Sequence, residues 1–117
     1  MKVHHGCPVQ ATINTLSGKW KVQAVWRLSF GPLRFAELRD LLRGVSEKVL
    51  TAQLRELERD GVVSRSVVRS SPPRVTYSLS PSGQTLIPLL DGLCDWGSKQ
   101  FGITPNLPRY PQSTRAL

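Results

Sequence analysis

Residues 46–61 read SEKVLTAQLRELERDG and predict one amphipathic helix with a stop signal. Leu50, Leu54 and Leu57 recur at a spacing that places them on one face of an α-helix, so we expect this face to be buried. Ser46 is a suitable N-cap, because its hydroxyl oxygen can accept a hydrogen bond from a free amide of the first turn. The helix is expected to run to Asp60 and to stop at Gly61.

The opposite face of this helix is cationic. A small residue flanked by cations lets a helix approach a polyanion closely, and the helix N-terminus favours phosphate. Because the N-terminal part of such a helix enters the major groove, Lys48 and Thr51 are the candidates for contacts to bases, and Arg59 is expected only to brace the fold. The candidate DNA-binding residues of the helix are Ser46, Lys48, Thr51, Ala52 and Arg55.

This helix alone leaves an alternative open. Glu56, Glu58 and Asp60 lie beside the arginines, so the cationic face could equally be a solvated, salt-bridged surface.

Three further helices are predicted before residue 46. Pro8 suits a first helical turn and indicates a helix over residues 8–16. Residues 19–30 carry a wide apolar stripe that Gly31 and Pro32 terminate. Residues 34–42 form a short helix that ends near Gly44.

After Gly61 the pattern becomes β-branched and partly alternating. Residues 62–68 and 74–80, separated by RSSPP, predict a hairpin. Ser80 and Pro81 then open a last helix that reaches about Phe101, with Pro88 near enough to its start to kink it.

The order of these elements predicts a mainly α fold with a small β-hairpin (α+β), arranged as a winged helix-turn-helix. With 117 residues, 39% of them apolar, the chain is long enough for one domain, which we expect over residues 1–103. Residues 104–117 are expected to be an irregular, proline-containing tail. The sequence shows no membrane span and no secretory signal, so we expect a cytoplasmic protein.

The formal net charge of +8 predicts a polyanionic partner, and nucleic acid is the commonest. The excess is uneven, because residues 1–33 and 62–80 contain basic but no acidic side chains. Around the expected hairpin tip, Arg69, Ser70, Ser71 and Arg74 could reach phosphates or a minor groove, unless the tip is merely a floppy polar turn. Arg34 could contact a phosphate from the start of its helix, or be only a surface charge.

The last helix is apolar around much of its circumference, which predicts a homodimer. We expect Leu86, Leu90, Leu93 and Trp96 to be buried against a second copy of the chain. A twofold dimer presents its two recognition helices about 34 Å apart, so the expected partner is double-stranded DNA with a palindromic operator.

Six short segments resemble the HxlR-type transcriptional regulators, a branch near the MarR group of winged helix-turn-helix proteins. They are CPV at 7–9, GKW at 18–20, RFAEL at 34–38, LTAQLRELERDG at 50–61, PPRVTYSLSPSG at 72–83 and DWG at 95–97. The resemblance implies a homodimeric DNA-binding regulator, more often a repressor, with dimer contacts from the N- and C-terminal helices. The family usually has threonine where Ser80 stands, and no family pattern matches the tail.

Members of this family sense oxidants or electrophiles through a cysteine at the position of Cys7, which makes Cys7 a possible redox sensor and Cys94 of the other subunit its resolving thiol. The helix start and the nearby Lys2, His4 and His5 favour a reactive thiolate. The alternative is that Cys7 is a small buried residue and that Cys94 only packs in the core.

No catalytic motif is present, and adjacent histidines suit a single metal poorly, so we expect no enzyme, no metal site and no cofactor. A thiol-dependent enzyme built on Cys7 is the one enzymatic variant. A winged helix that contacts proteins or RNA without binding an operator is the alternative function.

Overall fold

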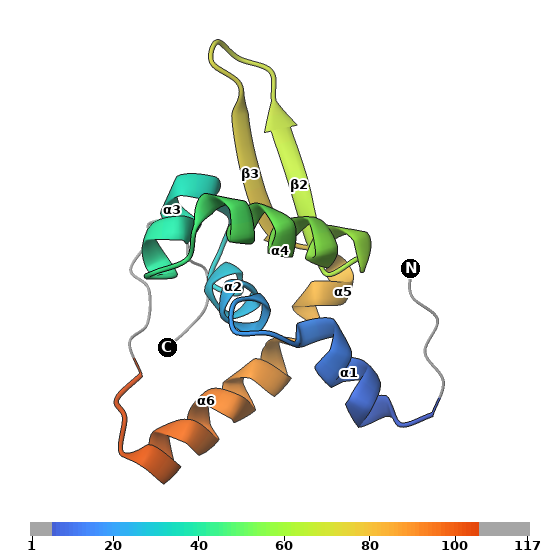
Figure 1. Ribbon diagram of the computed structural model, residues 1–117, viewed down its shortest axis with the longest axis vertical. Coiled ribbons are helices and arrows are strands. Elements are labelled where there is room, and N and C mark those ends of the chain that lie inside the picture. The colour runs from blue at the N-terminus through green and yellow to red at the C-terminus, as the bar shows by residue number, and fades with distance from the viewer. Residues whose placement is uncertain (1–5, 106–117) are drawn as a thin grey trace.

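The helices and strands follow the expected order, with two differences. The computed structural model describes residues 6–105, so most of the expected tail and the first five residues lie outside the described part. Its elements are shown in Figure 1: α1 Pro8–Leu16, α2 Lys21–Leu28, β1 Leu33–Arg34, α3 Phe35–Leu41, α4 Glu47–Arg59, β2 Val63–Val68, β3 Arg74–Leu79, α5 Pro81–Gln84 and α6 Ile87–Phe101. The fold is therefore mainly α with a small β-hairpin, as predicted.

Helix α4 has the ends that its sequence predicts. The Ser46 hydroxyl oxygen accepts a hydrogen bond from the backbone amide of Val49 at 3.1 Å, which satisfies one donor of the first turn. Asp60 is the C-cap, and Gly61 follows with a φ of 79°, a conformation that glycine adopts without steric cost. Leu50, Leu54 and Leu57 are completely buried in the core, as their spacing predicted.

The first difference is a third strand. β2 and β3 pair antiparallel from Val63–Leu79 to Val68–Arg74, which confirms the hairpin. Strand β1 adds to the free edge of β3, where Leu33 lies opposite Tyr77 and Arg34 opposite Thr76. Two residues are too few to show an alternating pattern, so the sequence could not indicate this strand.

The second difference is that the last helix is divided. Ser80 caps the short helix α5 by accepting from the Gly83 amide at 3.0 Å, and α5 ends at Gln84. Pro88 then lies in the first turn of α6, where its missing N–H leaves no bond unmade. The prediction of one continuous, kinked helix was therefore wrong, because Pro88 starts a new helix.

The two ends of the molecule carry different elements. The hairpin projects from one end, and α1 and α6 form the other (Figure 1). The core lies between them and contains the leucines of α4, the inner face of α2, Leu79 of β3 and Leu90 of α6. Within residues 6–105, no helix is long and apolar enough to cross a membrane.

We predict that Gly83→Ala destabilises the protein by about 1–3 kcal/mol. A Cβ atom at Gly83 would lie 2.2 Å from the backbone oxygen of Val62, so the backbone must shift. Gly92→Ala in α6 is the control, because nothing lies within 4 Å of its added Cβ. Urea denaturation at equal protein concentrations should separate the two variants, and equal stabilities would contradict the close packing of α5.

Candidate nucleic-acid interface

The cationic face of α4 is directed to solvent. The side chains of Lys48, Ala52, Arg55 and Arg59 are exposed, on the side of the helix opposite its buried leucines. Thr51 is only half-buried, so part of its side chain is also at the surface. Ser46 is exposed, and its hydroxyl oxygen caps the helix while its hydrogen can still donate.

Two acidic side chains of α4 pair with cations of other helices. Glu56 pairs with Lys21 of α2, with 3.1 Å between Nζ and Oε1, and Glu47 pairs with Arg39 of α3. In the part of the chain that the structure describes, neither Lys48 nor Arg55 takes part in an ion pair. The alternative of a salt-bridged surface therefore does not describe these two cations, which remain available to an external anion.

The start of α3 and the hairpin tip lie around one hollow of about 370 Å³. The pairing of β1 with β3 explains this proximity, since Arg34 lies opposite Thr76, two residues from Arg74. The Arg34 backbone amide donates to Glu37 Oε1 at 2.8 Å, while its side chain remains exposed. Arg69 is exposed but does not line the hollow, whose walls are Arg34, Val68, Ser70, Ser71, Pro72 and Arg74.

The apolar residues of α6 divide between the core and the surface. Leu93 and Trp96 are 53% and 61% exposed, as required of residues expected to meet a partner. Leu90 is only 2% exposed and belongs to the core of its own chain, so including it in the partner-facing surface was wrong. Leu86 is half-buried against the same core.

Helix α1 completes this apolar surface, as the family resemblance implied, through residues that the sequence had not singled out. Val9 and Ile13 are exposed, and together with Leu89 and Leu93 they line a groove of about 420 Å³ between α1 and α6. Val9 and Ile13 are four residues apart in the sequence, and this helical spacing could have indicated an apolar face on α1.

The two cysteines differ in their surroundings. Cys7 is exposed at the N-cap of α1, so the alternative of a small residue buried in its own chain is wrong. Cys94 is half-buried and borders a hollow of about 200 Å³ beside Phe101 and Ile103. Both are free thiols, whereas Lys2, His4 and His5 lie outside the described residues. Among residues 6–105, no three histidine, cysteine or carboxylate side chains are grouped as metal ligands.

Lys21 was missed in the sequence, although a signal existed. It occupies the first position of the buried stripe of α2, followed by Ala24, Val25 and Leu28 at helical spacing. A lysine at such a position must find a partner inside the protein.

Comparisons with known proteins agree with this geometry. The family model described as HxlR-like helix-turn-helix matches residues 15–104. The uncharacterized HTH-type transcriptional regulator YdeP of Bacillus subtilis strain 168 is 47% identical over 94 residues, which cover 80% of this chain and 73% of that protein. A second such regulator, from Methanothermobacter thermautotrophicus, is 42% identical over 82% of this chain and 72% of its own length.

Solved structures give the same result. The redox regulator HypR in its reduced form superposes with a TM-score of 0.79 at 39% identity, covering 81% of this chain and 94% of that one. Diamide-treated YodB from B. subtilis has a TM-score of 0.68 at 30% identity, covering 87% and 100%. With its exposed cationic helix, its hairpin and these similarities, the chain belongs to the HxlR-like helix-turn-helix family of transcriptional regulators.

Proposed function

We propose that this protein is a homodimeric, sequence-specific DNA-binding repressor that responds to oxidants. The observation that carries the proposal is the outer face of α4, where Lys48 and Arg55 are exposed and take part in no ion pair within residues 6–105. A helix of this kind fits the major groove, which is wide enough to admit it and displays a distinct pattern for each base pair. Ser46, Thr51 and Ala52 complete the contact surface.

The hollow between α3 and the hairpin supplies the accompanying phosphate contacts. Arg34 and Arg74 come from adjacent strands and border the same space, where Ser71 adds a hydroxyl donor. The Ser70 hydroxyl donates to the Pro72 carbonyl oxygen, so Ser70 can only accept from a partner there. Such contacts position a protein on the duplex without reading its sequence. Arg69, at the exposed tip, is the candidate for the adjacent backbone or minor groove.

The second copy of the chain covers the apolar surface of α1 and α6. In this surface Val9, Ile13, Leu89 and Leu93 surround the groove, and Trp96 and Phe101 extend it along α6. An apolar surface of this extent is typical of an interface between chains. A twofold axis here leaves both copies of α4 free and predicts a palindromic operator with half-sites about one DNA turn, roughly 34 Å, apart. Repression is proposed on the resemblance to the HxlR-type regulators, which are more often repressors.

Oxidant sensing is proposed to begin at Cys7. The thiol is exposed at the start of α1, beside the surface at which the two copies meet, and Cys94 lies on the other helix of that surface. Oxidation that joins Cys7 to Cys94 of the partner subunit would change how α1 and α6 pack. The solved structures of HypR in reduced and oxidised forms and of diamide-treated YodB support a redox role in this family.

Substitutions on the outer face of α4 test the proposed contacts to bases. Lys48→Ala or Arg55→Ala should each weaken binding to a duplex selected from random DNA by roughly 1–3 kcal/mol, because contacts to base edges are lost. Lys99→Ala in α6 is the control for charge, because this lysine is paired with Asp95 of the same helix. Wild-type affinity should also fall steeply with salt, log K dropping by about 0.9 per phosphate contact for each unit of log salt concentration. Undiminished binding by both α4 variants, or a flat salt dependence, would favour a module that docks on proteins.

A charged substitution on α6 tests the proposed dimer surface. Leu93→Glu should convert the protein to a monomer, because it places a carboxylate in the apolar interface. Val67→Glu, an equally exposed valine on the hairpin, is the control and should remain dimeric. Light scattering after size-exclusion chromatography reports the mass, and a dimeric Leu93→Glu variant would rule out this surface.

Oxidation with diamide tests the proposed roles of Cys7 and Cys94. Diamide should release wild-type protein from DNA while it accepts two electrons and two protons from a pair of thiols that become a disulfide. Wild type should then migrate as a covalent dimer without reductant, whereas Cys7→Ser and Cys94→Ser should not. Equal release of wild type and Cys7→Ser would reject Cys7 as the sensor, and a covalent dimer of Cys94→Ser would reject Cys94 as its partner.

A further inference from the structure

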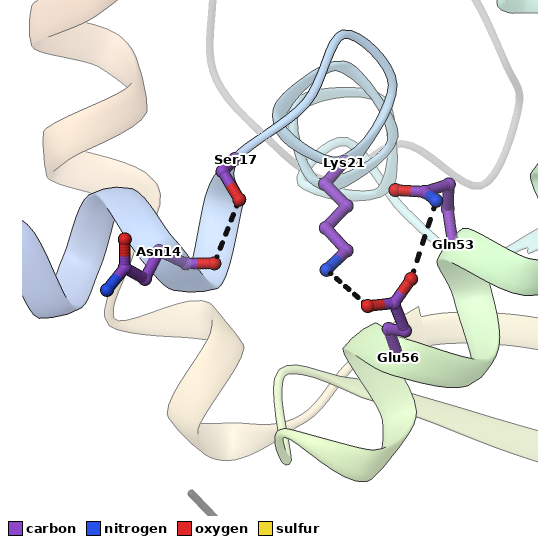
Figure 2. A network of polar contacts seen from close by, with 5 residues as sticks. All are labelled: Asn14, Ser17, Lys21, Gln53 and Glu56. Carbon is purple, nitrogen blue, oxygen red and sulfur yellow. Dashed lines mark hydrogen bonds and ion pairs between the residues drawn. The ribbon is translucent and has the colours of Figure 1, made fainter. Parts of the chain in front are cut away.

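A lysine lies inside the protein at the point where α2 meets the recognition helix. Lys21 is the first residue of α2 and is 4% exposed. Figure 2 shows its side chain extending to Glu56 of α4, where Nζ lies 3.1 Å from Oε1. The other carboxylate oxygen accepts from Gln53 Nε2 at 3.5 Å, so the carboxylate is held on both sides.

Stability alone gives little reason for a lysine at this position. Removing an ammonium group from water is costly, and a cation in the first turn of a helix opposes the helix dipole. The Glu56 side chain is 40% exposed, so solvent weakens its attraction to Lys21, and apolar replacement of such a pair is often neutral or stabilising. An apolar residue would also continue the buried stripe of Ala24, Val25 and Leu28. The pair is therefore better explained by what it orients.

The ion pair restricts a motion that the leucines leave open. Leu50, Leu54 and Leu57 set the depth of α4 in the core, but apolar contacts are not directional and permit a small rotation about the helix axis. The hydrogen bond from Lys21 to Glu56 restricts that rotation, because the carboxylate must remain within reach of a buried donor. Glu56 directly follows Arg55, so the same rotation sets the direction of the Arg55 side chain.

We propose that Lys21 is a positioning residue for DNA recognition: through Glu56 it fixes the rotation of α4 and so determines which base edges Lys48 and Arg55 face. The inference rests on the proposed function, since it requires α4 to read DNA. Lys21 itself makes no contact with DNA, because it is buried behind the helix.

This network adjoins the surface assigned to the second copy of the chain. Ser17 and Gly18, just before α2, line the groove between α1 and α6. On its other side, a Cβ atom at Gly18 would lie 3.9 Å from Gln53 Oε1. The segment just before Lys21 therefore adjoins both the proposed dimer surface and the recognition helix.

The test compares two duplexes and three variants of the full chain. One duplex is selected from random DNA by the wild-type protein, and the other has the same composition in shuffled order. Lys21→Met removes the ammonium group and keeps the length of the side chain. Lys21→Met with Glu56→Met replaces the whole pair, and Lys99→Met removes a paired, exposed lysine from α6 as the control for charge.

We expect Lys21→Met to lose roughly tenfold or more in affinity for the selected duplex and nothing for the shuffled one, because misaligned base contacts are lost while phosphate contacts remain. Its salt dependence and melting temperature should not fall. The double variant should behave in the same way, and Lys99→Met should discriminate as well as wild type.

Three results would overturn the inference. Lys21→Met could discriminate between the two duplexes as well as wild type. It could instead bind both duplexes more weakly and with a smaller salt dependence, which would make Lys21 a phosphate contact. If both Lys21→Met and the double variant unfold, the pair serves stability rather than recognition. A wild-type protein that itself fails to discriminate between the duplexes would instead refute the proposed function.

Discussion

The burial of Leu50, Leu54 and Leu57 determines which side of α4 faces solvent. These leucines are completely enclosed, and exposing even one would cost about 1.5–3 kcal/mol of apolar transfer. Because the helix cannot turn them outward, the side chains about half a turn away must face solvent. The exposure of that cationic face is therefore a consequence of the core. The Ser46 cap and Gly61 set the length of the helix.

The molecule separates two surfaces of opposite character. At one end, α4 and the hairpin present Lys48, Arg55 and Arg74 to solvent. At the other end, α1 and α6 expose Ile13 and Trp96. In the proposed complex, one end of the molecule binds DNA and the other end packs against a second copy of the chain.

Elements with their own periodicity could be predicted from the sequence. Helix α4, its cap and the hairpin were predicted correctly, because each has a local pattern and a local stop signal. Strand β1 was missed because two residues have no period and form a strand only by pairing with β3. The sequence could not decide whether Pro88 bends a helix or begins one, because proline is accepted both in a first turn and at a kink.

The candidate site was predictable to a similar degree. The exposure of Lys48 and Arg55 follows from the leucine spacing. That Arg34 and Arg74 line the same hollow depends on strand β1, which was not predicted. Leu90 and Leu93 lie on one helix that is apolar on several sides, so the sequence could not assign Leu90 to the core and Leu93 to the surface. Lys21 shows that a polar residue in an apolar stripe deserves its own explanation.

Methylation of the selected duplex by dimethyl sulfate tests most directly whether α4 reads the major groove. Guanine N7 lies in the major groove, and adenine N3 lies in the minor groove. Bound protein should protect guanine N7 in two groups whose centres are about one helical turn, roughly 10 base pairs, apart. Unprotected N7 atoms throughout the bound duplex, with protection confined to adenine N3, would contradict the account.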